Sequence, residues 1–309
     1  MTLTVGSNFE DPPSSQRTLL FQHSGKDTDS RGGSDFLSAE CLWPRQAMLS
    51  AVMRRRNVLA IGIAATGIAA RRVAVIAHRG EHLKHPENSL PGIAAAIEAG
   101  VDYVELDVRT TSDGRLVPMH DATVDARTNG RGAVKDLSFA EIRALDCGIK
   151  MGVKFAGTQV PSFEEALKLM QGRCGLYLDW KAADASALVE ALRQHEMVSR
   201  TVVYGRVEGL AELRKLEPKL RVMPEAVSLE VLRQTLLSLK PSVVAFDRRD
   251  FVDEVIALAR EAKADVFVDR LGPDDTEDGW LDAVARGATG IQTDHPAELI
   301  AVLKNKGWH

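Results

Sequence analysis

The stretch VELDVRTTSDGRLVPMHD, residues 104–121, carries acids and a histidine in a strand-like pattern. Side chains at alternate positions of a strand point to one face, so Glu105 and Asp107 share a face. The Asp-Gly pair at 113–114 predicts a two-residue hairpin turn, which would place Asp107 opposite His120. Neighbouring buried carboxylates are costly unless something positive neutralises them. The stretch therefore fits either a divalent metal site or a solvated hairpin with ordinary surface acids.

Other polar residues follow apolar, β-branched runs at the points where strands should end. They are His78 and Arg79, His120 and Asp121, Asp179 and Lys181, and then Glu225, Asp247, Asp269 and Asp294. An aspartate in this position is often only the N-cap of the next helix, and we interpret Asp247 and Asp294 in this way. The two histidines, His78 and His120, occur with the acids Glu105, Asp107 and Asp179. Catalysis at a metal explains this combination better than helix capping does. The histidines at 82, 85, 195 and 295 are interpreted as surface or structural residues.

The elements that must position these side chains alternate along the chain. Amphipathic, helix-period segments separate most of the short apolar runs, which span 73–78, 103–108, 175–180, 201–205, 220–225, 243–247, 266–269 and 290–294. Eight strand-helix units in roughly 235 residues predict an α/β fold, a (β/α)8 TIM barrel, whose active site lies at the carboxyl ends of the strands. Residues 116–121 form a return strand of a β-hairpin, and 122–160 form a small insertion after the second strand. A doubly wound sheet is the alternative, but no G-x-G-x-x-G fingerprint supports it.

Composition bears on the partners of the protein and on its N-terminal segment. The 309 residues are 45% hydrophobic and carry a net charge of -4. The sequence contains no basic stripe of the kind that would predict a nucleic-acid partner. Residues 1–52 have a composition typical of disorder, or they are an over-extended reading frame that precedes a true start at Met53. Residues 53–71 resemble a twin-arginine export signal or a short apolar anchor, so we expect a protein that is exported or tethered to a membrane through residues 53–70. The alternative is a cytosolic protein with a disordered tail.

Residues 72–309 carry a series of ordered motifs. They include His-Arg-Gly at 78–80, Pro-Glu-Asn at 86–88, the Glu-x-Asp pair, VPSFEEAL at 160–167 and GIQTDHP at 290–296. In these motifs the chain resembles the glycerophosphodiester phosphodiesterase family, which includes lysophospholipase D-type enzymes and is related to the phosphatidylinositol-specific phospholipase C barrels. The resemblance implies a phosphodiesterase barrel over this whole range.

The resemblance also implies roles for individual residues. Glu105, Asp107 and Asp179 would be the metal ligands, and His78 and His120 would be the acid/base pair. Most relatives have a glutamate where this chain has Asp179, which is one methylene shorter. Three carboxylates form an oxygen-rich site suited to Ca²⁺ or Mg²⁺ rather than to Zn²⁺.

The remaining implied contacts are to the substrate. Arg79 and Lys181 would bind the phosphate, and Glu87 and Asn88 match a substrate-binding loop. Asp269 adds an acid where many relatives have asparagine. The expected function is hydrolysis of glycerophosphodiesters to glycerol 3-phosphate and an alcohol, in glycerophospholipid metabolism and with no obligatory protein partner. The alternatives are a lysophospholipase D or other lipid phosphodiesterase, and an inactive barrel that acts as a binding protein.

Overall fold

The computed structural model of the protein describes residues 72–309. The predicted N-terminal extension and export signal, at 1–71, lie outside the described residues. Within 72–309, no helix is both long and apolar enough to cross a membrane. Several helices begin at polar residues whose side chains accept from the first free backbone N–H groups: Ser89 caps the first helix, Asp184 the fourth, and Ser162 forms a capping box with Glu165.

Eight parallel strands form the barrel in residues 72–309, as predicted. They pair in the order β6-β5-β4-β2-β1-β9-β8-β7, and the ends of β6 and β7 meet through a parallel bridge between Glu225 and Ala245. A ninth strand, β3, pairs antiparallel with β2 outside this circuit. The strands are β1 (Ala74–Ala77), β2 (Tyr103–Thr110), β3 (Leu116–Pro118), β4 (Gly175–Ala182), β5 (Thr201–Tyr204), β6 (Arg221–Met223), β7 (Val243–Phe246), β8 (Asp265–Asp269) and β9 (Gly290–Thr293).

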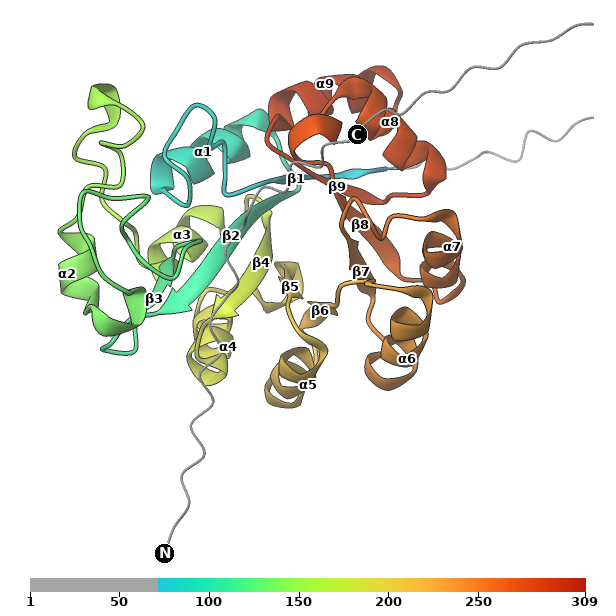
Figure 1. Cartoon of the computed structure of the whole chain (residues 1–309), viewed down its shortest axis with the longest axis horizontal. Coiled ribbons are helices and arrows are strands. Elements are labelled where there is room, and N and C mark those ends of the chain that lie inside the picture. The colour runs from blue at the N-terminus through green and yellow to red at the C-terminus, as the bar shows by residue number, and fades with distance from the viewer. Residues whose placement is uncertain (1–71) are drawn as a thin grey trace, which may run out of the picture. The chain divides into compact units, whose positions relative to one another are not determined.

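Helices follow the barrel strands and surround them (Figure 1). Apolar side chains between helices and strands make the large core, and a smaller cluster that includes Ile76, Tyr177 and Phe267 fills the barrel interior. The helices are α1 (Leu90–Ala99), α2 (Phe139–Arg143), α3 (Phe163–Met170), α4 (Ala185–Gln194), α5 (Val207–Leu216), α6 (Leu229–Leu239), α7 (Asp253–Glu261), α8 (Glu277–Arg286) and α9 (Pro296–Asn305).

The segment between β3 and α3 forms an insertion to one side of the barrel (Figure 1). It contains α2 and has its own apolar cluster, with Val124, Val134 and Ile142 buried beside Val117 of β3. Arg143 of α2 donates to Glu165 of α3 through Nη2 at 2.8 Å. These contacts fix the insertion against β3 and α3, next to the strand that carries Glu105 and Asp107.

The hairpin between β2 and β3 differs from the prediction by one residue. Thr111 donates from its backbone N–H to Arg115, and the loop 112–114 has three residues, with Gly114 at φ 78°. The backbone N–H of Met119 donates to the carbonyl of Asp107, so Met119, and not His120, lies opposite Asp107. A shift of one residue exchanges the two faces of a strand, so the predicted pairing of Asp107 with His120 is wrong.

Candidate active site

Three carboxylates converge at the carboxyl end of β2 and β4. Asp107 and Asp179 lie side by side in the parallel register, and Glu105 precedes Asp107 on the same face of β2. One carboxylate oxygen from each of the three side chains lies within 4.8 Å of the other two. Glu105 and Asp107 are 2% and 1% exposed, so this is a buried acidic cluster rather than a solvated hairpin.

The electrostatics of this cluster fit a cation. Burial, and then the charges of Asp107 and Asp179, raise the pKa of Glu105 well above its usual value. Burial also raises the pKa of Asp179, although Lys181 opposes that shift. Three converging carboxylates with hard oxygen donors are the ligands that divalent cations such as Ca²⁺ and Mg²⁺ prefer. The predicted metal ligands therefore meet in space and form a site that could bind a metal.

Two cations flank the carboxylates. Lys181 Nζ lies 2.7 Å from Asp179 Oδ2 and 3.5 Å from Asp107 Oδ1. Arg79 donates its backbone N–H to Glu105 Oε2 at 2.8 Å, and its Nε lies 3.5 Å from Asp107 Oδ2. Burial opposes ionisation of both groups, but the nearby carboxylates raise the pKa of each. Both side chains therefore stay cationic beside the acids, where a phosphate could meet them.

The loop after β1 holds the predicted Pro-Glu-Asn motif against β2. Asn88 donates from Nδ2 to Asp107 Oδ2 at 2.9 Å and accepts from the Asp107 backbone N–H at 3.3 Å. Glu87 accepts from Arg79 Nη1 at 3.3 Å. Arg79 and Asn88 both have φ of 53°, in the left-handed region that non-glycine residues rarely adopt. Both residues contact Asp107, and strained backbone conformations of this kind cluster at functional sites.

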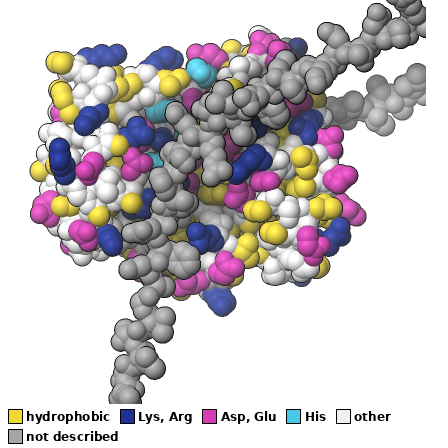
Figure 2. All heavy atoms as spheres, viewed as in Figure 1, with side chains coloured by type: hydrophobic (Ala, Val, Ile, Leu, Met, Phe, Trp, Pro, Cys, Tyr) yellow, Lys and Arg dark blue, Asp and Glu magenta, His cyan; other side chains and the backbone are white. Residues whose placement is uncertain are grey.

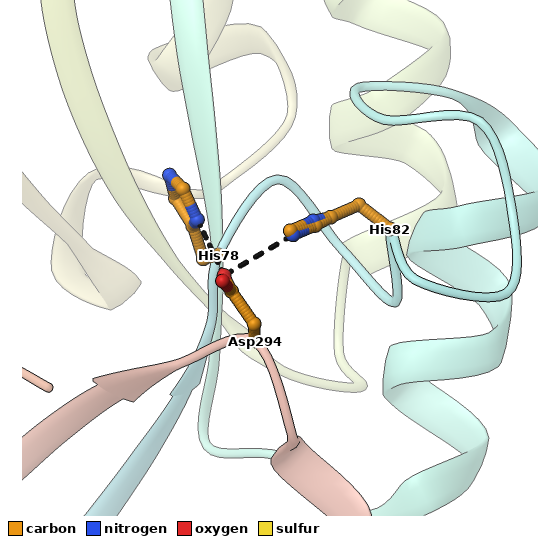
Figure 3. A group of neighbouring side chains, drawn as sticks. All are labelled: His78, His82 and Asp294. Atoms are coloured by element: carbon orange, nitrogen blue, oxygen red, sulfur yellow. Dashed lines mark hydrogen bonds and ion pairs between the residues drawn. The ribbon is translucent and has the colours of Figure 1, made fainter. Parts of the chain in front are cut away.

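His78 is held by a carboxylate that the sequence did not identify. Its Nδ1 lies 2.7 Å from Asp294 Oδ1, and His82 Nε2 lies 3.1 Å from the same oxygen (Figure 3). The structure corrects two interpretations: His295, not Asp294, is the N-cap residue of α9, and His82 is only 15% exposed in its side chain. Although burial opposes it, the hydrogen bond and charge of His78 lower the pKa of Asp294. Burial lowers the pKa of His82.

His120 has a carboxylate partner of its own. Its Nδ1 lies 2.8 Å from Asp121 Oδ1, and its backbone carbonyl accepts from Nη2 of Arg109 at 2.7 Å. His120 lies near enough to the acidic cluster for its charge to act on Asp179, although it does not oppose Asp107 in the hairpin. The adjacency of His120 and Asp121 was the sequence signal that could have identified this pair.

Further acids lie at the carboxyl ends of β6, β7 and β8: Glu225, Asp247 and Asp269. Burial, and then the carboxylates of Asp179 and Asp247, raise the pKa of Asp269 to about 7. Asp247 is not a helix N-cap, because Val252 is the N-cap residue of α7. Instead, Asp247 Oδ1 accepts from the backbone N–H groups of Arg249 and Asp250. Tyr204 donates to Glu225 Oε2 at 3.2 Å. These residues make the wall beyond Asp179 strongly acidic.

Comparisons with known proteins agree with this geometry. Residues 78–298 match the model of the glycerophosphoryl diester phosphodiesterase family. A glycerophosphodiester phosphodiesterase of Caldanaerobacter subterraneus is 32% identical over 250 residues, which are 75% of this chain and 98% of that protein.

Solved structures show the same fold. A glycerophosphodiester phosphodiesterase from Agrobacterium tumefaciens matches with a TM-score of 0.66 and 28% identity, covering 74% of this chain and 99% of that one. An Oleispira antarctica phosphodiesterase, solved with the product sn-glycerol-3-phosphate, matches with a TM-score of 0.69 and 23% identity, covering 75% and 96%. The chain described here belongs to the glycerophosphoryl diester phosphodiesterase family, a family of phosphoric diester hydrolases.

Proposed function

We propose that this protein hydrolyses glycerophosphodiesters to sn-glycerol 3-phosphate and an alcohol, with a divalent cation and two histidines. The observation that carries the proposal is the meeting of a three-carboxylate cluster, two cationic side chains and two carboxylate-paired histidines at one barrel mouth. The Oleispira relative of this fold holds sn-glycerol-3-phosphate, which supports the same product here.

Charge decides what the site can bind. When all three carboxylates are ionised, as metal binding requires, Glu105, Asp107 and Asp179 together with Arg79 and Lys181 carry one net negative charge, which would repel a phosphodiester. A divalent cation held by the three carboxylates reverses that sign. The bound cation would polarise a phosphoryl oxygen and offset the charge that develops on it. Ca²⁺ and Mg²⁺ are the cations that this oxygen-only donor set suits.

The chain's own residues would handle the phosphate and the protons. Arg79 and Lys181 would orient the phosphoryl oxygens by charge-assisted hydrogen bonds. One histidine would accept the proton of the attacking oxygen while a new bond to phosphorus forms. The other would donate a proton to the leaving alcohol oxygen while its bond to phosphorus breaks. Asp294 and Asp121 would each hold one imidazole in a single orientation, as the carboxylate of a histidine–carboxylate pair does.

A cavity next to the acidic cluster supports a second candidate substrate class. It has a volume of about 440 Å³, and Asp179, Trp180, Tyr204 and Glu225 line it together with Val227 and Val231. Val227 and Val231 are 50% and 43% exposed, which leaves an apolar rim beside the reacting groups. A lysophospholipid could place part of its acyl chain there, so lysophospholipase D activity is the alternative.

The test is product release by the full chain from two substrate classes. Glycerophosphocholine and glycerophosphoethanolamine are compared with a lysophosphatidylcholine, each with EDTA, Ca²⁺ or Mg²⁺, and glycerol 3-phosphate is measured against lysophosphatidic acid. Metal-dependent glycerol 3-phosphate is the expected product. Lysophosphatidic acid alone would favour the alternative, and no product with either class would indicate an inactive barrel that binds its ligand.

We also propose export directed by residues 53–71, supported by their arginine-rich start and short apolar run. N-terminal sequencing of the protein purified from its native host tests this proposal. A mature chain that begins close to residue 72 is expected. A product that retains residues 1–52 would contradict it.

A further inference from the structure

A second group of metal-donor side chains lies beside the carboxylate cluster. His78 stands at the end of β1, His82 in the loop that follows, and Asp294 at the end of β9 (Figure 3). One donor atom from each residue, a ring nitrogen of each histidine and a carboxylate oxygen of Asp294, lies within 4.8 Å of the other two. The group thus joins both ends of the barrel sequence at one point, and it contains the histidine to which the proposed function gives an acid/base role.

The donor set differs from that of the carboxylate cluster. Two imidazole nitrogens and one carboxylate oxygen are the ligands of many zinc sites with three protein donors, in which water takes the fourth position. In Figure 3 both rings approach the Asp294 carboxylate, each with one nitrogen directed at it. The nitrogen-to-oxygen distances are 2.7 Å and 3.1 Å. Tetrahedral Zn²⁺ places its donors about 3.3 Å apart, so small side-chain rotations would admit the ion.

His82 is the member of the group that has little other use. Its two ring nitrogens are buried, and apart from the close approach to Asp294 neither has a hydrogen-bond partner among the described residues. Buried polar atoms without partners are rare and call for a physical explanation. A cavity of about 330 Å³ is lined by His82, His85, Glu87, Arg127 and Cys147 among others, which gives an ion a route to the ring.

We propose that His78, His82 and Asp294 form an inhibitory zinc site. Zinc would bind Nδ1 of His78 in the neutral tautomer that carries its proton on Nε2, so the proton on Nδ1 would leave to solvent while Nε2 takes one up, and the ion would occupy the Asp294 oxygen that now holds His78. His78 would then lose the partner that orients it. The binding stands on the donor geometry alone, whereas the inhibition rests on the proposed function of His78. Ca²⁺ or Mg²⁺ at the carboxylate cluster would therefore raise turnover, whereas Zn²⁺ at His78, His82 and Asp294 would lower it.

Binding is measured first and without substrate. Equilibrium dialysis of the full chain against Zn²⁺, in saturating Ca²⁺ or Mg²⁺, compares the wild type with His82→Ala and with the control His195→Ala, at the C-cap of α4. His82→Ala should lower the affinity of one site at least about tenfold, while His195→Ala leaves it unchanged. The wild type and both variants all contain residues 1–71, so any zinc that binds there contributes equally to each measurement. His82→Gln serves as a second variant if His82→Ala does not fold.

Equal zinc affinity in the wild type and both His82 variants would overturn the site, and so would displacement of the ion by excess Ca²⁺ or Mg²⁺. Inhibition is then measured as turnover against added Zn²⁺, with an expected loss of more than tenfold that both His82 variants relieve. Zinc that binds at His82 but leaves turnover unchanged would overturn the inhibition and contradict the role of His78, while the site itself would stand. An enzyme without any turnover leaves the dialysis result decisive.

Discussion

Each proposed catalytic histidine contacts a carboxylate of its own, Asp294 for His78 and Asp121 for His120. A carboxylate at Nδ1 fixes the ring orientation and leaves the opposite nitrogen for the substrate. The two carboxylates come from distant parts of the sequence, since Asp294 follows β9 and Asp121 follows β3. This duplication fits a reaction in which one proton is removed and another is supplied.

Replacing either histidine should therefore remove one proton transfer. His78→Ala and His120→Ala are each expected to lower kcat by about 10²–10⁴-fold, the range for loss of a general acid or base. His195→Ala, at the C-cap of α4, is the control and should keep wild-type turnover. Steady-state kinetics with glycerophosphocholine check this prediction. Wild-type kcat in a folded, metal-loaded His78 or His120 variant would exclude that residue from the chemistry.

Asp294→Asn tests positioning rather than direct chemistry. The amide keeps the size of the side chain but cannot stabilise a protonated His78, so kcat should fall by at least about tenfold with little change in KM. Asp253→Asn, an exposed residue paired with Arg286, is the matched control. A rise in KM with unchanged kcat would show instead that Asp294 acts in substrate binding. Unchanged kinetics would remove it from the site.

At the scale of elements, the turn between β1 and α1 positions Arg79, and it depends on Gly80. Gly80 has φ of 81°, and a Cβ there would lie 2.8 Å from the backbone carbonyl carbon of Gly92 in α1. Gly114, in the β2–β3 hairpin, has a similar φ of 78° but open space around it. Comparing the two glycines therefore distinguishes the energetic cost of the backbone conformation, which both share, from the cost of close packing, which only Gly80 has.

Gly80→Ala should cost more stability than Gly114→Ala. Both carry the left-handed backbone penalty of about 1–2 kcal/mol, but only the first also pushes α1 away, at about 1–3 kcal/mol more. Urea unfolding of both variants measures the difference, and turnover should fall only in Gly80→Ala because Arg79 is displaced. Equal unfolding free energies for the two variants would contradict the close-approach argument.

The sequence predicted the elements well and their exact alignment less well. Apolar runs and capping residues such as Ser89 and Asp184 depend on local chemistry, so the strands and helices could be located. The hairpin register depends on one extra turn residue, and Asp-Gly is compatible with both loop lengths. Asp294 and His82 could not be assigned, because an aspartate after a strand fits a cap or a partner equally well until tertiary contacts are known.

For the whole molecule, the barrel concentrates acids at one mouth and holds them there by the packing around it. Figure 2 shows acidic, basic and histidine side chains intermixed on the face that it presents. Asp269 is the clearest sign of crowding, since burial and then its acidic neighbours raise its pKa to about 7. Such an arrangement sacrifices stability for function, so stability should depend on pH and on bound cation.

Asp269→Asn should reveal this cost. An unfolded aspartate titrates near 3.9, so between that pH and about 7 the folded wild type binds the extra proton and loses stability as the pH rises. The asparagine variant lacks this loss, so its gain in unfolding free energy over the wild type should grow from pH 4 to 7 and then level off. Urea unfolding in EDTA at several pH values checks the trend. A difference independent of pH would contradict the raised pKa.

We propose that the three carboxylates hold a divalent cation on which phosphodiester cleavage depends. The direct measurement is glycerol 3-phosphate release from glycerophosphocholine by the full chain, titrated with Ca²⁺ or Mg²⁺ after EDTA, beside metal binding by the wild type and Glu105→Gln. Turnover should be absent in EDTA and rise with the same midpoint as binding, and Glu105→Gln should shift both midpoints to higher metal concentration. Full turnover in metal-free protein, or equal midpoints in Glu105→Gln and the wild type, would contradict the account.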